Sequence, residues 1–403
     1  MNIIRPEENA ILIWNLELAR TAYVSGEELT SLDHWATGFD NPFSDRLEKL
    51  GVISKANKQA IADAIQASTQ IKAPTNSFYA PESLHIELTE YCPLKCPMCY
   101  KTSTCSELPI DFLLDIIRQA AEMQVFQIAL GGGEPLVYPE LLTAIRKISY
   151  YKMASTITTS GVGLTYERIE ELKHAGLNHI QISLNGSSEA IHSLSRDGFN
   201  DGLEALKTLQ KAQISCGINW VARMDNIDDF PQMIKLAKTC NVDNINILRY
   251  KPSLGEDYNN IALSDEKILI LEKYIRNAKG IRLKVDSAFS NLRCKLNGRT
   301  SFMSGCGAGR RFLAVSACGS YMPCSHVNMK ERPLEHSNHL HHVWRNSKNL
   351  AMFRNLGHNI SSPCSDCIYL HGCYGCRAII LSQSEDFNAG EMHCINKHKK
   401  HGG

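Results

Sequence analysis

The stretch Cys92-Pro93-Leu94-Lys95-Cys96-Pro97-Met98-Cys99-Tyr100 decides the fold, because it places three cysteines within eight residues. Three thiolates this close can reach three corners of one cubane iron–sulfur cluster and leave one iron without a protein ligand. An open iron is where a substrate or cofactor can bind, as metal catalysis requires. A zinc knuckle is the alternative. Zinc sites usually have four ligands in pairs with two-residue gaps, however, and the gaps here are three and two residues.

Alternating strand and helix patterns surround this stretch from about residue 82 onward. Strands are predicted at 83–88, 127–130, 155–158, 179–183, 217–221 and 245–248. Helices are predicted between them, for example over 111–123, 167–174 and 230–239. This alternation predicts an α/β fold with a parallel sheet, here a partial (β/α) TIM-like barrel. Active sites of such barrels lie at the C-terminal ends of the strands, which is where the three cysteines fall.

Four short motifs come next along the chain, three of them at the ends of the predicted strands and the fourth further downstream. They are Gly131-Gly132-Gly133-Glu134-Pro135, Thr159-Ser160-Gly161, Ile182-Ser183-Leu184-Asn185-Gly186 and Ser195-Arg196-Asp197-Gly198. A simple glycine turn would not need Glu134 or Pro135, although Ser183 alone could be a satisfied strand hydroxyl. Glycines let a ligand approach the backbone, and the polar groups beside them can receive an ammonium group.

Together these residues resemble the radical S-adenosylmethionine (SAM) superfamily over roughly residues 82–255. The resemblance implies that Cys92, Cys96 and Cys99 hold a catalytic [4Fe–4S] cluster. Met98 departs from the aromatic residue that many members carry there, although Tyr100 follows. The implied SAM-binding residues are Tyr100, Gly132, Gly133, Glu134, Pro135, Ser160, Ser183 and Arg196. A reduced cluster in this family cleaves SAM, and the 5′-deoxyadenosyl radical that forms abstracts hydrogen from the substrate.

A second group of cysteines lies near the C-terminus and resembles the SPASM extension over about residues 290–395. By that pattern Cys364, Cys367, Cys373 and Cys394 would hold one auxiliary [4Fe–4S] cluster. Cys306, Cys324 and Cys376 would hold the other, so we expect three clusters in all. Cys294 is a candidate fourth ligand of this other cluster, and Cys318 is an alternative candidate for the same position. If neither cysteine binds, one iron of the cluster has no protein ligand. A zinc ribbon is the alternative for residues 364–376.

The remaining thiols and histidines receive simpler interpretations. Cys105, Cys216 and Cys240 are predicted to be packed residues. The histidines of 339–342 are expected at a surface or an edge, since thiolates are the better ligands for iron–sulfur clusters. His326, two positions after Cys324, is a weak candidate for proton transfer.

Bulk composition narrows the class of protein. The chain has 403 residues, with 43 Lys plus Arg against 42 Asp plus Glu, and this balance gives no support for a nucleic-acid or anionic-membrane partner. No apolar stretch has transmembrane length and no signal peptide is recognised, so we expect a cytoplasmic protein. The odd count of 15 cysteines argues against a purely disulfide framework and favours metal ligation in a reducing compartment.

Three domains are predicted: 1–80, 81–285 and 286–403. Residues 11–18 and 21–24 are predicted strands, and Ser25 with Glu28 is a candidate capping box. A helix over 43–50 should end at Gly51, and 72–77 is a candidate linker. The first domain resembles a winged-helix-like element that captures a leader peptide by strand addition. A cap that only covers the barrel is the equal alternative.

The expected function is that of a SPASM peptide maturase. Its substrate would be a peptide or protein, such as a ribosomal precursor peptide, and its electron donor a flavodoxin or ferredoxin. A sulfatase-maturase-like enzyme is a second candidate, although such enzymes place an Asp where this chain has Ser325. A small-molecule radical SAM enzyme and a non-enzymatic electron carrier are two more candidates. An electron carrier would need neither the glycine motif nor Arg196.

Overall fold

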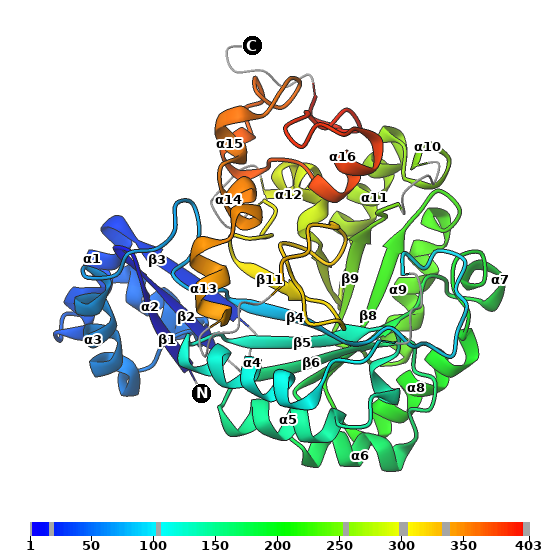
Figure 1. The fold of residues 1–403 in the computed structure, drawn as a ribbon, viewed down its shortest axis with the longest axis horizontal. Coiled ribbons are helices and arrows are strands. Elements are labelled where there is room, and N and C mark those ends of the chain that lie inside the picture. Colours follow the sequence, from blue (N-terminus) through cyan, green and yellow to red (C-terminus); the bar gives the residue numbers. More distant parts are fainter. Residues whose placement is uncertain are drawn as a thin grey trace.

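The computed structural model describes residues 2–15, 20–101, 106–252, 258–297, 305–332 and 339–397 (Figure 1). Cys105, which was predicted to be a packed residue, and the end of the predicted strand 11–18 lie outside these ranges.

A nine-stranded sheet forms the centre of the molecule, in the order β10-β9-β8-β7-β6-β5-β4-β11-β12. The six predicted strands are β4 (Ser83–Thr89), β5 (Gln127–Gly132), β6 (Ala154–Thr159), β7 (His179–Ser183), β8 (Cys216–Ala222) and β9 (Asn244–Arg249). They are parallel, and the predicted α/β fold with a partial TIM-like barrel is confirmed. Three strands were not predicted: β10 (Arg282–Val285), β11 (Phe312–Val315) and β12 (Tyr321–Met322).

Helices cover the convex face of the sheet (Figure 1). They are α4 (Ile110–Glu122), α5 (Leu141–Tyr150), α6 (Tyr166–His174), α8 (Phe199–Ala212), α9 (Phe230–Thr239) and α11 (Asp265–Asn277). Three shorter helices lie elsewhere: α7 (Glu189–His192) near Asn185 after β7, and α10 (Tyr258–Ile261) and α12 (Ser290–Asn297) toward the C-terminal region. The strand residues between helices and sheet are fully buried and apolar, among them Ile128, Ile157, Ile180, Ile218 and Ile245. Their burial supplies the main hydrophobic stabilisation of the barrel.

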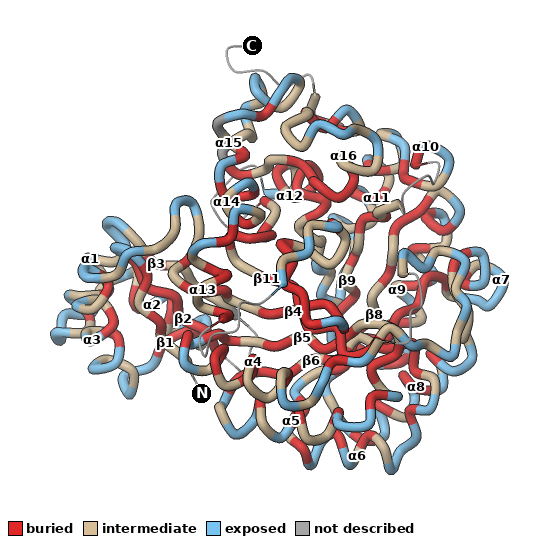
Figure 2. The backbone as a smooth tube through the Cα atoms, in the orientation of Figure 1, coloured by how far each residue is buried: buried red, intermediate tan, exposed pale blue. Residues whose placement is uncertain are grey.

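The opposite, concave face of the sheet is polar, which is unusual for a parallel sheet. Asn246 donates to Asn219 (2.9 Å), and Asn219 donates to Thr158 (3.4 Å) across neighbouring strands. Gln127 donates to Thr156 in the same way (3.2 Å). These residues are half-buried, so the inside of the barrel is a hydrogen-bonded polar wall rather than an apolar core. Figure 2 shows the burial of the chain along these strands.

The N-terminal unit is an antiparallel sheet of β1 (Asn2–Glu7), β2 (Ala10–Asn15) and β3 (Arg20–Ser25), followed by α1 (Gly26–Ala36), α2 (Pro42–Lys49) and α3 (Lys58–Ser68). The first strand was not predicted. Ser25 precedes α1 but makes no capping hydrogen bond, so the predicted capping box is wrong there. Asn41 and Ser44 form one at α2 instead, and Gly51 follows that helix with a φ of +68°.

A buried arginine fixes this unit to the barrel. The side chain of Arg5 is 1% exposed, contacts Glu7 at 2.7 Å and lies over the Phe126 ring. Its guanidinium also donates to the carbonyls of Ala80, Pro81 and Gln124 at 2.9–3.1 Å. The barrel-facing side of the small sheet adds Leu12 and Trp14, which pack on Phe126 and Ala154. Both faces of this sheet are therefore buried.

The C-terminal region has few regular elements. They are the helices α13 (His339–Asn346), α14 (Lys348–Arg354), α15 (Leu356–Asn359) and α16 (Arg377–Gln383), and the 3-10 helices Ser287–Phe289 and Leu370–Gly372. The other 3-10 helices are Lys55–Asn57, Pro135–Val137 and Ile227–Asp229. The end of the region lies against α12 and the end of β9 (Figure 1). The described residues include no helix long and apolar enough to cross a membrane.

Candidate active site

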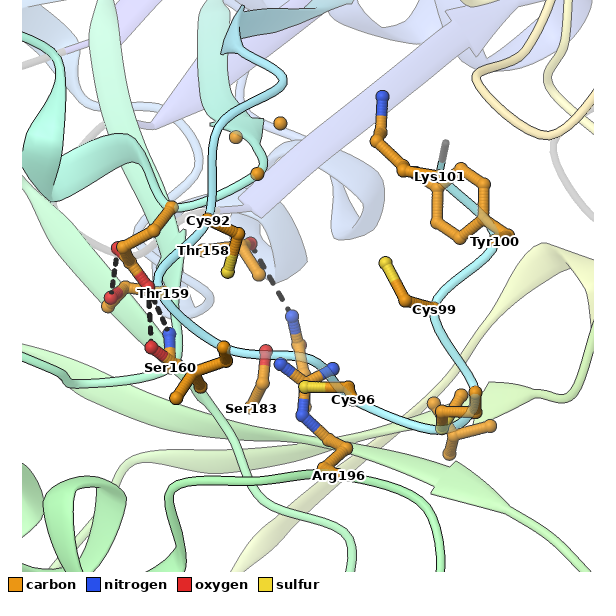
Figure 3. Close-up of a pocket in the computed structure, with 18 of the residues that line it drawn as sticks. Cys92, Cys96, Cys99, Tyr100, Lys101, Thr158, Thr159, Ser160, Ser183 and Arg196 are labelled. Atoms are coloured by element: carbon orange, nitrogen blue, oxygen red, sulfur yellow. Dashed lines mark hydrogen bonds between the residues drawn. The ribbon is translucent and has the colours of Figure 1, made fainter. Parts of the chain in front are cut away.

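A cavity of about 570 Å³ opens at the C-terminal ends of the barrel strands. Its wall brings together ten of the predicted site residues from five separate segments, as Figure 3 shows in part. They are Cys92, Cys96, Cys99, Tyr100, Gly132, Gly133, Glu134, Ser160, Ser183 and Arg196. Pro135 does not line the cavity and begins a 3-10 helix instead.

The cysteine loop is held by the segment that carries Arg196. The Met98 N–H donates to the Ser195 carbonyl (3.1 Å), and the Lys95 N–H donates to the Asp197 carboxylate (2.9 Å). Asn185 completes the attachment, because its amide nitrogen donates to Met98 Sδ and Ser195 Oγ, both at 3.0 Å. A carboxylate could not donate these bonds. Asn185 is thus matched to Met98, the residue at which the loop departs from the family pattern.

The glycines of 131–133 make room for the chain itself. Gly132 has a φ of +122°, and a Cβ there would lie 2.4 Å from the Thr89 carbonyl oxygen. A Cβ on Gly133 would lie 2.1 Å from the Tyr91 carbonyl oxygen. The Gly133 and Glu134 N–H groups donate to these same two carbonyls. We expected the missing side chains to admit a ligand, and the structure shows that they first admit the base of the cysteine loop.

Glu134 is 1% exposed, and hydrogen bonds occupy its carboxylate. Oε1 accepts from Thr159 Oγ1 (2.6 Å) and the Leu136 N–H (3.2 Å). Oε2 accepts from the Ser160 N–H (2.9 Å) and hydroxyl (2.6 Å). Each oxygen therefore already has two donors, which fills its usual capacity. Glu134 positions the Thr159–Ser160 turn at the cavity wall.

Arg196 has free hydrogen-bonding capacity in the cavity. Its Nε is buried and has no hydrogen-bond partner among the described residues. A buried guanidinium nitrogen without an acceptor is costly, and a carboxylate is the acceptor that the planar fork fits best. The three cysteines of the loop line the same cavity (Figure 3). Burial raises the pKa of Cys92, and the hydrogen bond from the Leu94 N–H lowers it. Ligation to a metal would lower this pKa further. The donor set therefore fits an iron–sulfur cluster with SAM beside it.

Tyr100 and His326 form the other side of the cavity. Their rings are 4.2 Å apart, and Tyr100 also bonds to Ser325, so this wall reaches the residue that follows Cys324. Burial raises the pKa of Tyr100 and lowers the pKa of His326, so both are neutral near pH 7. Lys101 is paired with Glu87 beneath them.

The C-terminal cysteines form two groups. Cys306, Cys324 and Cys376 pack in one cluster. Burial and then repulsion between neighbouring thiolates raise the pKa values of Cys306 and Cys324. Cys364, Cys367, Cys373 and Cys394 line one further cavity with Glu391. Among the described residues, no three His, Cys, Asp or Glu side chains converge on a position for a single metal ion.

A backbone hydrogen bond of one kind recurs at six of the predicted cluster ligands. The N–H two residues later donates to sulfur at Cys92, Cys306, Cys324, Cys367, Cys373 and Cys394. Such bonds stabilise thiolates and tune iron–sulfur clusters. Among the described residues, Cys216 and Cys240 show none, and burial raises their pKa values as expected of packed thiols.

Cys294 and Cys318 do not join the first group. The Cys294 thiol bonds to Cys373, and this bond, with a donor from Ser290, lowers the pKa of Cys373. The structure therefore places Cys294 beside the second group, whereas we expected it beside the first. Cys318 is exposed in the β11–β12 turn, bonded to Ser316 (3.1 Å). It also accepts the N–H of Ser320, so that bond alone does not mark a ligand.

Sequence reasoning missed Arg249 and Lys251, which also line the cavity. Both lie at the end of β9, where the strand-end rule that located the other residues could have found them. The histidines of 339–342 were expected at a surface or an edge. His341 and His342 are partly exposed, but His339 is 6% exposed and bonds to Tyr321 (2.6 Å) and Asp115 (2.9 Å). Burial holds this ring between α13 and α4.

The sequence of the chain is similar to a known protein family and to two proteins of known name. Residues 86–237 match the family model described as the Radical SAM superfamily. The chain is 26% identical over 346 residues to an AdoMet-dependent heme synthase of Methanosarcina barkeri, covering 78% of this chain and 97% of that one. It is 26% identical over 331 residues to a PqqA peptide cyclase of Bradyrhizobium diazoefficiens, covering 77% and 86%.

Among solved structures, the fold is similar to SuiB of Streptococcus suis bound to S-adenosylmethionine. The TM-score is 0.75 at 18% identity, with 98% of both chains covered. SuiB bound to its precursor peptide SuiA gives a TM-score of 0.74 at 17% identity.

Proposed function

We propose that this chain, whose residues 86–237 form a radical SAM domain, is an enzyme that modifies a peptide by hydrogen abstraction. The observation that carries the proposal is the cavity that three cysteines of one loop line together with Arg196, whose buried Nε has no hydrogen-bond partner in the part of the chain that the structure describes. A cubane with an open iron and the amino-acid end of SAM require this pairing of thiolates and a carboxylate receptor. The matches to a peptide cyclase and to the fold of a peptide-bound enzyme support a peptide as substrate.

The protein's own residues have separate tasks at this site. Cys92, Cys96 and Cys99 would ligate a [4Fe–4S] cluster, and Arg196 would bind the SAM carboxylate. Tyr100, Gly132, Gly133, Ser160 and Ser183 would line the rest of the SAM site, with Glu134 and Pro135 shaping it. When bound, the cluster and SAM supply one-electron chemistry that removes a hydrogen atom from the substrate. Asn185 and Ser195 keep the loop and Arg196 at a fixed separation.

Two auxiliary [4Fe–4S] clusters complete the proposed cofactor set. Cys364, Cys367, Cys373 and Cys394 would hold one, and Cys306, Cys324 and Cys376 would hold part of the other. Backbone N–H donors on these sulfurs support ligation. Cys294 stays a candidate ligand, with its contact to Cys373 favouring the four-cysteine site. Thiolate ligation also favours a reducing, cytoplasmic setting with a flavodoxin or ferredoxin as electron donor.

The N-terminal unit is proposed to recognise a precursor peptide. β3 is an edge strand of the small sheet, so a peptide strand could pair with it. A groove of about 250 Å³ runs beside it, between Tyr23 and the linker residues 73–78. The burial of Arg5 supports a unit that holds the bound peptide at a fixed position relative to the cavity.

Anaerobic turnover tests the proposed function. Protein reconstituted with iron and sulfide would be reduced, mixed with SAM, and assayed for 5′-deoxyadenosine by mass spectrometry. We expect formation with the intact chain and none after Cys92→Ala, Cys96→Ala and Cys99→Ala together. Short peptides encoded beside the gene would then be screened for a mass loss or crosslink. Full cluster loading without SAM cleavage would refute the enzyme assignment and favour an electron carrier.

A further inference from the structure

A buried ion pair joins the barrel wall to the auxiliary cysteines. Arg249 ends β9 and lines the SAM cavity. Its guanidinium contacts the Glu391 carboxylate at 2.5 Å, and both side chains are 3% exposed. Glu391 belongs to the C-terminal segment that carries Cys394. The pair is therefore a direct contact between the predicted SAM site and the predicted auxiliary domain.

The two partners are rigidly held. Arg249 also donates to the carbonyls of Ala288 (3.1 Å) and His393 (3.0 Å), and to the Tyr258 hydroxyl (3.0 Å). The Phe289 ring lies beneath its guanidinium. The two terminal nitrogens of the arginine thus make three hydrogen bonds besides the ion pair, and these hold the charge in a fixed, buried position.

Glu391 touches both groups of auxiliary cysteines at once. Its carboxylate accepts the Cys376 N–H (3.0 Å), and its own N–H donates to Cys364 Sγ (3.3 Å). Gly375 allows this approach, because a Cβ there would lie 2.7 Å from Glu391 Oε2. Cys376 belongs to the three-cysteine group and Cys364 to the four-cysteine group. One carboxylate thus lies next to both predicted clusters.

A fixed charge beside a cluster changes its affinity for an electron. Reduction adds negative charge, which a nearby cation favours and a nearby carboxylate opposes, and burial leaves little solvent to screen either. Resting on the proposed function, we propose that Arg249 and Glu391 are positioning residues that set the reduction potentials of the auxiliary clusters by opposed charges. Neither residue is a cluster ligand or a catalytic residue in this assignment.

The test compares single and double neutralisation. Cys92→Ala, Cys96→Ala and Cys99→Ala would first be combined, so that only auxiliary clusters report. Glu391→Gln, Arg249→Gln and the double variant would be added to this background, and the potentials measured by EPR-monitored redox titration. We expect Glu391→Gln to favour reduction at least tenfold, which is about 59 mV for a one-electron couple. Arg249→Gln should disfavour reduction by a similar factor, and the double variant should return toward the parent.

Opposite signs are the result that a purely structural role would not produce. Potentials that shift in the same direction in both single variants, or in neither, would overturn the proposal. Should Arg249→Gln fail to load iron, Glu391→Gln is compared with Glu391→Asp, which keeps the charge. A rise with Gln but not with Asp supports the proposal, and equal potentials overturn it. A parent without auxiliary iron would refute the proposed cluster ligation instead, which iron analysis reveals separately.

Discussion

Replacing Arg196 should weaken SAM binding while leaving the protein without SAM at least as stable as before. The Arg196 Nε is buried without a hydrogen-bond partner among the described residues, so Arg196→Gln gives up no internal bond from that atom. A hydrogen bond to a charged group contributes about 1.5–3 kcal/mol. Losing it from a bound carboxylate should weaken the Kd for SAM about 10- to 160-fold.

Equilibrium dialysis with anaerobic, cluster-loaded protein measures this change. Arg196→Lys keeps the charge without the planar fork and should give an intermediate Kd. Arg168→Gln is the matched control, because Arg168 lies on α6 and does not line the cavity. Its guanidinium forms an ion pair with Glu171 at 2.7 Å. A Kd within about twofold of the parent for Arg196→Gln, at equal iron content, would refute the assignment of this residue to SAM.

Three further outcomes follow from the structure. Asn185→Asp should lower the stability of the protein without clusters by about 1–3 kcal/mol, because the carboxylate cannot donate to Met98 and Ser195; urea unfolding measures this, and unchanged stability would contradict it. Gly133→Ala should cost about 1–3 kcal/mol or more, since its Cβ meets backbone at 2.1 Å, whereas Gly131→Ala meets only the His85 ring at 3.1 Å and should cost less; equal unfolding midpoints would contradict the packing. Burial and then Lys284 lower the pKa of His179 to about 4. The contribution of this neutral ring to the free energy of unfolding should therefore be complete above about pH 6.5 and fall as the pH drops toward 4. Because the ring is partly exposed, we expect a loss of about 1–3 kcal/mol, and a His179→Gln variant with the same acid dependence would contradict this.

The arrangement of the barrel could be predicted from the sequence because strand ends of a parallel sheet converge. The cysteine loop and the motifs at 131–135, 159–161 and 182–186 each lie at the end of their own strand, so their order along the chain predicted their proximity in space. The three missed strands are short: β10 is only four residues, alternating charged and apolar, and β12 is two residues. Strand periodicity cannot be recognised over so few positions.

Details of the site depended on which donors fill which acceptors, and spacing does not encode this. Glu134 belongs to the predicted motif, yet four donors from its own turn and from 159–160 already occupy its carboxylate. Cys294 follows the predicted spacing, but α12 directs it to Cys373. Contacts between segments far apart in the chain decide both outcomes, and these contacts cannot be inferred from the spacing of residues in a single sequence.

EPR spectroscopy of the reduced protein with and without SAM tests the central claim most directly. We expect the signal of one cluster to change when SAM is added, and this component to be missing after Cys92→Ala, Cys96→Ala and Cys99→Ala together while other cluster signals remain. A spectrum that SAM leaves unchanged at full cluster occupancy, or that changes equally in the triple variant, would contradict a SAM site built on this loop.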